Sequence, residues 1–117
     1  MIRDLCNHIY KTLGPGFSER VYHNAMEVML RQKGINYETE RIVPIVFEGH
    51  TIGNVRADII IDGTIVLEFK AIKSLTDVME LQAHNYLNLL NLNEAYLVNF
   101  PPWPNLPVEI RKIVRNT

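Results

Sequence analysis

Two carboxylates and an amine stand in two neighbouring, strongly apolar segments of the chain. Asp58 lies in the segment from Arg56 to Asp62, and Glu68 and Lys70 lie in the segment from Thr64 to Ala71. Both segments are rich in Ile, Val, Leu and Phe, so we expect two largely buried strands. Side chains two residues apart on a strand project from the same face, which places Glu68 beside Lys70. Because buried charge is costly unless it is paired or binds a metal, this pattern indicates a functional polar site.

The turn between the two strands decides whether the carboxylates meet. Directly opposed residues of an antiparallel hairpin share a face. A two-residue loop, Asp62-Gly63, would place Asp58 and Glu68 on opposite faces. A three-residue loop from Ile61 to Gly63 would pair Asp58 with Val66 and place both carboxylates on one face. The three-residue loop requires positive φ at its third position, where the sequence has glycine, but Asp-Gly also suits the shorter turn.

Length, composition and charge exclude several classes of protein. The 117 residues predict a single domain over residues 1–117, large enough for one hydrophobic core. The net charge of −1 provides no overall basic field, which disfavours tight, nonspecific DNA binding by a monomer. Cys6 is the only cysteine, which excludes an internal disulfide and fits a reducing compartment. The sequence has neither a membrane-spanning apolar run nor a signal-peptide pattern, so we expect a cytoplasmic protein.

Apolar periodicity and breaker residues predict three helices and four strands. The helices cover residues 2–13, residues 18–33 with Gly34 as a left-handed cap, and a segment that begins near a Ser-x-x-Asp box at Ser74 and ends near residue 90. The strands cover residues 36–47, the segment that carries Asp58, residues 64–71 and residues 94–100, with Pro44 interrupting the first strand or marking it as an edge. A proline-rich tail follows. Its basic cluster, Arg111, Lys112 and Arg115, fits a solvated terminal helix.

The apolar stripe of each helix indicates the face that should be buried. In the first helix the stripe consists of Leu5, Cys6, Ile9, Tyr10 and Leu13. In the second it consists of Val21, Ala25, Val28 and Met29, with Met26 and Leu30 beside it. In the third it consists of Leu75, Val78, Met79, Ala83, Tyr86, Leu87 and Leu90, and Gln82 falls within it.

Two polar residues on these helices are further candidates for the site. A glutamine that faces a core needs partners for its amide, so Gln82 either binds a carbonyl at a strand edge or loop or lines the pocket of the carboxylates. Periodicity favours neither alternative. Glu19 lies in the first turn of its helix, where the helix dipole favours a carboxylate, and its simplest interpretation is an exposed side chain. It shares a stripe with Tyr22 and His23, and a single histidine is more often a structural residue than a site residue.

Two sets of motifs in the sequence resemble a known family. Gly16-Phe17-Ser18-Glu19-Arg20-Val21-Tyr22 resembles the Gly-x-x-Glu-x-x-Tyr motif of the GxxExxY protein family, and Leu13 to Gly16 before it also resembles that family. Asp58, Glu68-Phe69-Lys70 and the later Gln82, followed by Asn85-Tyr86-Leu87, resemble the ordered motifs of the PD-(D/E)XK nuclease-like superfamily, to which that family belongs. The resemblance covers nearly the whole chain. Ala57 stands where the superfamily name places proline, a position that is commonly relaxed.

The resemblance implies a fold, a cofactor and roles for these residues. It implies an α/β fold of the α+β sandwich kind, with a restriction-endonuclease-like αβββαβ core and a central mixed sheet flanked by helices. It implies Mg²⁺ or Mn²⁺ bound by Asp58, Glu68 and the backbone carbonyl of Phe69, because a hard cation offsets the charge that develops in phosphodiester hydrolysis. Lys70 would orient or help to deprotonate the attacking water. Glu19 would bind a second metal or a metal-bound water, and Gln82 would orient Lys70 or a ligand. The possible neighbours of the site are Tyr22, His23, Arg56 and Tyr86.

Two functions from different classes remain open. The first is a metal-dependent nuclease that acts on nucleic acid, with DNA as the expected substrate. It would work as a homodimer, because a chain this short offers little surface for gripping a duplex. The second is an inactive nuclease-fold module that binds nucleic acid or a protein partner. The full acidic set favours the nuclease, and the near-neutral charge favours the binding module.

Overall fold

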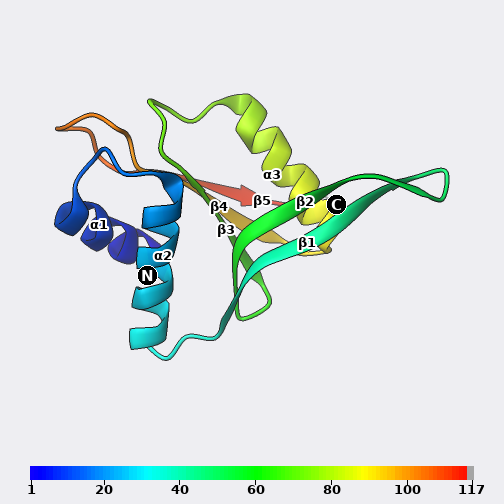
Figure 1. Cartoon of the computed structure of the whole chain (residues 1–117), viewed down its shortest axis with the longest axis horizontal. Coiled ribbons are helices and arrows are strands. Elements are labelled where there is room, and N and C mark those ends of the chain that lie inside the picture. Colours follow the sequence, from blue (N-terminus) through cyan, green and yellow to red (C-terminus); the bar gives the residue numbers. More distant parts are fainter. Residues whose placement is uncertain (116–117) are drawn as a thin grey trace.

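Five strands form one mixed sheet in the computed structural model of the chain, which describes residues 1–115 (Figure 1). The strands follow one another across the sheet in chain order, β1 to β5. Only β3 and β4 run parallel, and the other neighbouring pairs are antiparallel. The strand bounds are β1 Tyr37–Phe47, β2 His50–Ile61, β3 Ile65–Lys70, β4 Glu94–Asn99 and β5 Glu109–Val114. The expected mixed sheet is therefore confirmed, with one more strand than the sequence predicted.

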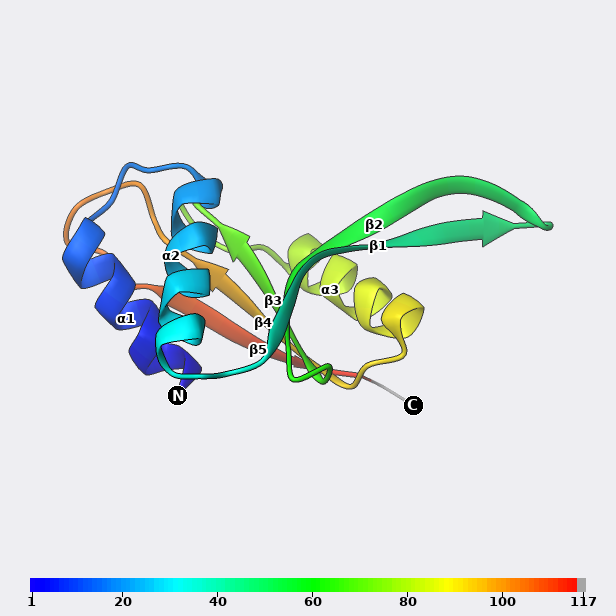
Figure 2. The same cartoon turned by 60° about the horizontal axis from the view of Figure 1, so that its bottom comes forward.

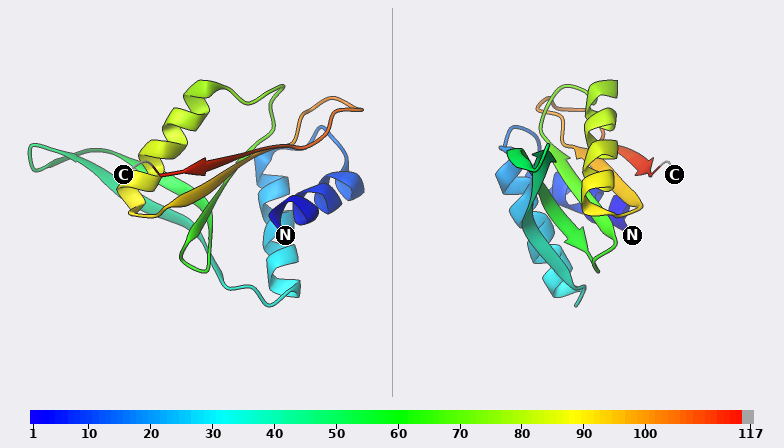
Figure 3. Two further views of the ribbon diagram at one scale, coloured as in Figure 1. Left: turned by 180° about the vertical axis from the view of Figure 1, so that it is seen from behind. Right: turned by 90° about the vertical axis from the view of Figure 1, so that its right-hand side faces the viewer.

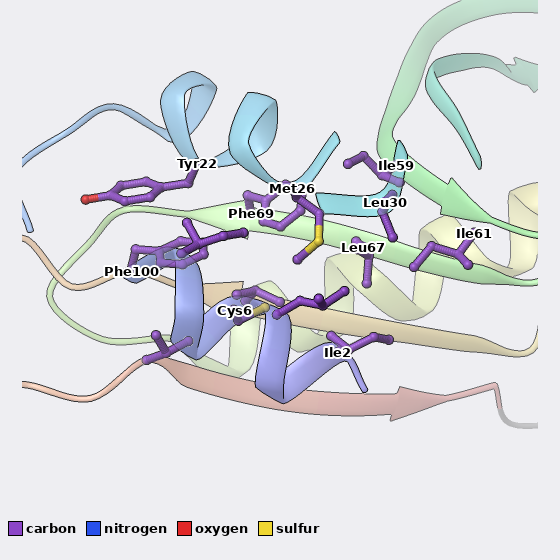
Figure 4. Close-up of a cluster of buried hydrophobic side chains, with 14 residues drawn as sticks. Ile2, Cys6, Tyr22, Met26, Leu30, Ile59, Ile61, Leu67, Phe69 and Phe100 are labelled. Carbon is purple, nitrogen blue, oxygen red and sulfur yellow. The ribbon is translucent and has the colours of Figure 1, made fainter. Parts of the chain in front are cut away.

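Three helices cover the two faces of the sheet (Figure 3). Helices α1 (Ile2–Leu13) and α2 (Glu19–Gln32) pack on one face, and α3 (Asp77–Leu90) packs on the other. Figure 4 shows the first core layer, in which the buried side chains of α1 and α2 meet those of β2, β3 and the segment after β4. Successive strand residues alternate between these layers. Ile59 and Ile61 therefore face α1 and α2, whereas Ile60 faces α3.

Helix α2 begins and ends at the residues that its sequence indicates. Ser18 is the N-cap residue, with extended backbone. At the other end Gly34 has a φ of 67°, which glycine adopts without steric cost. The amide of Ile35 donates to the carbonyl of Leu30 at 3.0 Å, and that of Gly34 donates to the carbonyl of Arg31 at 3.1 Å. These two bonds form a Schellman motif, which satisfies carbonyls at the end of the helix.

The buried faces of the helices differ from the predicted stripes. In α2 the buried residues are Tyr22, His23, Met26 and Leu30, whereas Val21 and Val28 of the predicted stripe are exposed. In α1 and α3 one member of each predicted stripe, Leu13 and Val78, is also exposed. Helix α2 has two adjacent apolar stripes. The stripe that contains Tyr22 lies toward the sheet because Tyr22 stacks on the ring of Phe100, with ring centroids 4.2 Å apart.

The segment of Arg111 and Lys112 is a strand and not part of the predicted terminal helix. Strand β5 pairs with β4, and its basic residues are bound to neighbouring groups. Arg111 donates to Glu80 at 2.9 Å and to the carbonyl of Leu75 at 3.0 Å, which holds the start of α3 against the sheet. The cap of α3 also differs from the prediction. Its N-cap residue is Thr76, whose hydroxyl accepts the amide of Met79, and Ser74 lies outside the helix.

The β1–β2 hairpin extends beyond the rest of the sheet as an arm (Figure 2). We define the arm as residues 42–55. Pro44 lies within β1, at the edge of the sheet, which agrees with its predicted position. A register irregularity follows between Ile45 and Val46. The exposed large apolar residues of the arm are Ile42, Val46, Phe47 and Ile52.

Two further findings concern the class of protein. Burial raises the pKa of the Cys6 thiol to about 12, so this cysteine is a protonated core residue of α1. Among the helices within residues 1–115, none has the length and apolar composition that crossing a membrane requires.

Candidate active site

The turn between β2 and β3 places the two carboxylates on one face. The last residues to pair are Ile61 and Ile65, so the loop has three residues, Asp62, Gly63 and Thr64. Of the two loop lengths that the sequence allowed, the structure has three residues, and the expected positive φ of Gly63, 68°, is confirmed. Gly63 is the second residue of the loop and not the third, and Asp62 before it also has positive φ, 51°. The loop lies one residue further along the chain than expected, so the register opposes Asp58 to Glu68 and not to Val66. This shift of two residues in register keeps both carboxylates on the α3 face.

The hydrogen-bonded ladder between β2 and β3 ends just before the carboxylates. Backbone pairing covers only Ile59 to Ile61 on β2. Beyond it the amide of Phe69 donates to Oδ2 of Asp58 at 2.9 Å. The carboxylate of Asp58 thus replaces the backbone of β2 as the acceptor for β3. A gap therefore opens between the two strands at the level of Asp58.

The carbonyl of Phe69 also points into this gap. The carbonyl of Lys70 accepts the amide of Phe100 at 2.9 Å, so it points toward the β4 side of the strand. Successive carbonyls of a strand alternate in direction, so the carbonyl of Phe69 points the other way, toward Asp58. The structure therefore brings a third oxygen donor to the two carboxylates.

Glu68 is a buried carboxyl group with an unsatisfied oxygen. Only 6% of its surface is exposed, and its Oε1 atom has no hydrogen-bond partner among the described residues. Burial raises the pKa of Glu68 well above its ordinary value, and the negative charge of Asp58 raises it further, whereas the Lys70 ammonium opposes the shift. A cation beside Glu68 would favour the ionised form and give its Oε1 atom a partner.

A cavity of about 410 Å³ opens in front of these groups. It is lined by both carboxylates, by Phe69 and Lys70 of β3, by Glu19 of α2 and by Tyr86 of α3. Burial raises the pKa of Tyr86, as do the charges of Glu68 and Asp58. Its hydroxyl therefore remains protonated and can donate a hydrogen bond in the cavity.

The oxygen donors fit a small divalent cation. Within residues 1–115, no three side chains of His, Cys, Asp or Glu form a metal-binding cluster. Mg²⁺ does not need such a cluster, because it usually keeps several waters and binds one or two carboxylates. The set of Asp58, Glu68 and the carbonyl of Phe69 meets this requirement, and the unsatisfied Oε1 atom of Glu68 is a free ligand.

Comparisons with known proteins identify the family. The family model described as "PD-(D/E)XK nuclease superfamily" matches residues 1–113. The chain belongs to the PD-(D/E)XK nuclease superfamily. The finer assignment to the GxxExxY family, based on Gly16, Glu19 and Tyr22, is compatible with this match and stays a prediction.

Two solved structures have a similar fold. SSO0001 is 26% identical, with a TM-score of 0.63 over 84% of this chain. The chain spans half the length of SSO0001. The alkaline exonuclease LHK-Exo from Laribacter hongkongensis is 11% identical, with a TM-score of 0.53, and the match covers 98% of this chain and 67% of the exonuclease. No curated protein matches this sequence.

The glutamine of the superfamily motif lies beside the carboxylates but not in the core. Gln82 is exposed on α3, which corrects its predicted place on the buried stripe. It lines a narrow recess together with Glu68, Lys70 and Tyr86. Of the two alternatives for Gln82, the structure thus places it next to the site.

Glu19 reaches the site from the other side of the sheet. Although α2 packs on the face opposite α3, the gap between β2 and β3 exposes Asp58 to both sides. Glu19 is exposed and lines the main cavity. The turn before it is held by Tyr22, whose hydroxyl donates to the carbonyl of Gly14 at 2.7 Å. Tyr22 is fully buried, so its contact with the site is indirect, through the position of Glu19.

The two remaining predicted neighbours lie on a second cavity beside the first. His23 is 3% exposed, and its Nε2 atom lies 2.9 Å from Oε2 of Glu27, which makes it a structural residue. Arg56 is exposed and lines both cavities.

Sequence reasoning missed a polar clamp behind Lys70. Asn99, fully buried and aligned with Lys70 in the register, donates to the carbonyl of Ile72 at 2.8 Å and accepts the amide of Ile72 at 2.9 Å. It also donates to Glu109 at 2.9 Å, which accepts the amide of Leu75 at 2.9 Å. The clamp fixes the chain between β3 and α3. Its signal in the sequence is an asparagine at the end of an apolar strand.

Proposed function

We propose that this protein is a nuclease that hydrolyses phosphodiester bonds with Mg²⁺ or Mn²⁺, and that its substrate is DNA. Its membership of the superfamily and its resemblance in fold to an exonuclease support a nuclease-like function. The observation that carries the proposal is the unsatisfied, buried Oε1 atom of Glu68 opposite Asp58. Asp58, Glu68 and the carbonyl of Phe69 would hold the cation, which supplies positive charge against the reacting phosphate and lowers the pKa of water.

The side chains of the cavity divide the remaining tasks. The Lys70 ammonium orients the attacking water and balances negative charge on the phosphate. Glu19 accepts a hydrogen bond from water on the α2 side, and Gln82 orients Lys70 from the α3 side. The burial of Glu68 strengthens its electrostatic interactions.

We further propose that the protein acts as a homodimer. The four apolar side chains of the arm are each more than half exposed, from 58% for Val46 to 65% for Ile52. The arm carries no lysine or arginine between Arg41 and Arg56, so its surface suits a protein partner better than a nucleic acid. Pairing two copies would also double the cationic surface available to DNA.

Cleavage of defined substrates with Mg²⁺, with Mn²⁺ and with EDTA tests the proposed activity. We expect cleavage only with metal, and Asp58→Asn or Lys70→Met should lower its rate by roughly a hundredfold or more, the range for groups that act on the reacting water. The matched controls are Asp62→Asn, at the exposed β2–β3 turn, and Lys73→Met, an exposed lysine after β3. The substrates are single-stranded, duplex and branched DNA and RNA. Metal-dependent binding to any of them, with cleavage of none, would favour an inactive binding module.

A further inference from the structure

A second cavity lies on the α2 side of the gap between β2 and β3. Its volume is about 390 Å³, within the range of about 300–1,000 Å³ typical of sites for small ligands. It shares walls with the main cavity, formed by Glu19, Arg56, Asp58 and Phe69. Asp58 therefore lines two neighbouring cavities.

The second cavity contains two guanidinium groups in addition to the shared carboxylates. Within residues 1–115, Arg56 forms no salt bridge with any carboxylate. Arg20 binds Glu40, with its Nη2 atom 2.6 Å from Oε1, and this pair remains near the surface. Once the carboxylates hold a cation, the charge left in the cavity is positive, and a guanidinium is well suited to binding a phosphate.

The walls of the second cavity offer little for recognising a base. Its aromatic residues are Phe69 and His23, which are 1% and 3% exposed and already pack edge to face on each other. Neither ring is available as the stacking platform that binds bases in single-strand sites. The Ser18 hydroxyl, which makes no capping hydrogen bond to α2, is a further donor on this wall.

From this arrangement we propose that the second cavity binds the nucleotide next to the scissile phosphate, through its phosphate and sugar and not through its base. Arg56 binds the phosphate of this nucleotide. Arg20 exchanges Glu40 for the same phosphate when the site fills. The substrate strand then runs past Asp58, along the two neighbouring cavities, and the subsite accepts any base. The inference rests on the proposed nuclease function and assigns the path of the substrate.

The first test measures binding without cleavage. Thymidine 5′-monophosphate, which has no phosphodiester bond to cut, is titrated into the full chain with Mg²⁺. We expect Arg56→Gln to weaken its binding about tenfold, the order expected for one lost charge-assisted contact. Thymidine should bind weakly to both proteins. The control is Arg31→Gln, in the last turn of α2 beside Glu27, which should bind like the wild type. Equal affinities of wild type and Arg56→Gln would overturn the proposal.

The second test separates the subsite from the catalytic centre. We expect Arg56→Gln to lower kcat/KM for a single-stranded oligonucleotide about tenfold more than for bis(4-nitrophenyl) phosphate, which has no neighbouring nucleotide. The slope of log KM against log salt should also decrease by about 0.7, the value for one phosphate contact on a single strand. Equal losses on both substrates would overturn the subsite. Nucleotide binding that depends on Arg56, in a wild type that cleaves nothing, would support the subsite and contradict the proposed function.

Discussion

Glu68 links the stability of the protein to pH and to metal. Its carboxyl group is buried opposite Asp58, and its pKa is raised well above the ordinary value. The folded state therefore prefers the protonated form. This contribution to stability is complete below the unfolded pKa of about 4.3 and is lost as the pH rises through the raised folded pKa.

The first prediction concerns this residue. Without metal, the free energy of unfolding of the wild type should decrease as the pH rises from 4 toward neutrality, and Glu68→Gln should remove this part of the decrease. Mn²⁺ should stabilise the wild type by mass action and the variant much less. Urea melts over this pH range, with EDTA and with Mn²⁺, measure both effects. The control is Glu48→Gln at the exposed tip of the arm. Identical pH profiles of wild type and Glu68→Gln would contradict the assignment.

At the scale of single elements, the turn before α2 positions Glu19. The hydroxyl of Tyr22 accepts the amide of Phe17 at 3.4 Å and donates to the carbonyl of Gly14 at 2.7 Å. One side chain thus ties together the two ends of the turn at Pro15-Gly16. The rest of its ring is fixed by stacking on Phe100.

A prediction for this element follows from the two hydrogen bonds. Tyr22→Phe should destabilise the protein by about 1 kcal/mol, the usual net value of a hydrogen bond, and speed hydrogen exchange at the amide of Phe17. Tyr37→Phe is the matched control, because the Tyr37 hydroxyl binds Arg31 and Glu27 at the other end of α2. Thermal melts and amide exchange measure the two effects. If Tyr37→Phe speeds exchange at Phe17 equally, the hydroxyl of Tyr22 does not hold the turn.

The elements also show what the sequence could determine. The shared face of the carboxylates was predictable because the side-chain period of a strand is two. A loop displaced by one residue shifts the register by two residues and therefore keeps both side chains on the same face. The register itself was not predictable, since Thr64 suits a loop and a strand equally. For α2 the sequence offered two apolar stripes, and only the stacking of Tyr22 on Phe100, remote in sequence, selects one.

Other differences have equally local causes. Ser74 and Thr76 both offer a capping hydroxyl, and the clamp of Asn99 and Glu109 on the chain before α3 leaves Thr76 as the cap. Strand β5 was missed because its charged residues imitate a solvated helix. In the structure Arg111 binds Glu80 and Lys112 binds Glu94, and Arg115, just after the strand, binds the asparagines at the end of α3.

For the molecule as a whole, the arm is a projecting surface that carries four exposed large apolar side chains. Its apolar side chains are exposed on a hairpin that extends from the sheet (Figure 2). The C-terminal cations are occupied by internal contacts, so they add little to the binding of nucleic acid. The proposed association through the arm would provide both burial of apolar surface and a second set of cationic residues.

The corresponding prediction concerns the oligomeric state. The wild type should sediment as a dimer, and Phe47→Lys should raise the dissociation constant at least about thirtyfold, as for an interface residue worth about 2 kcal/mol. Leu81→Lys on α3 is the control, because Leu81 is 60% exposed and Phe47 is 62% exposed. A wild type that remains monomeric at all concentrations would contradict association through the arm.

The mixed topology of the sheet has a consequence for the order of folding. Strands β1, β2 and β3 are joined by tight turns, whereas the parallel pairing of β3 with β4 must wait for the crossover through α3. We expect the three-stranded meander to form the folding nucleus. Ile60→Val in β2 should slow folding, and Ile113→Val in β5 should mainly speed unfolding, as chevron plots of the two variants will measure. Equal φ-values would contradict this order. Asp58 and Glu68 both belong to the meander, so the early nucleus already brings their oxygens together, and a divalent cation should accelerate folding as well as stabilise its product.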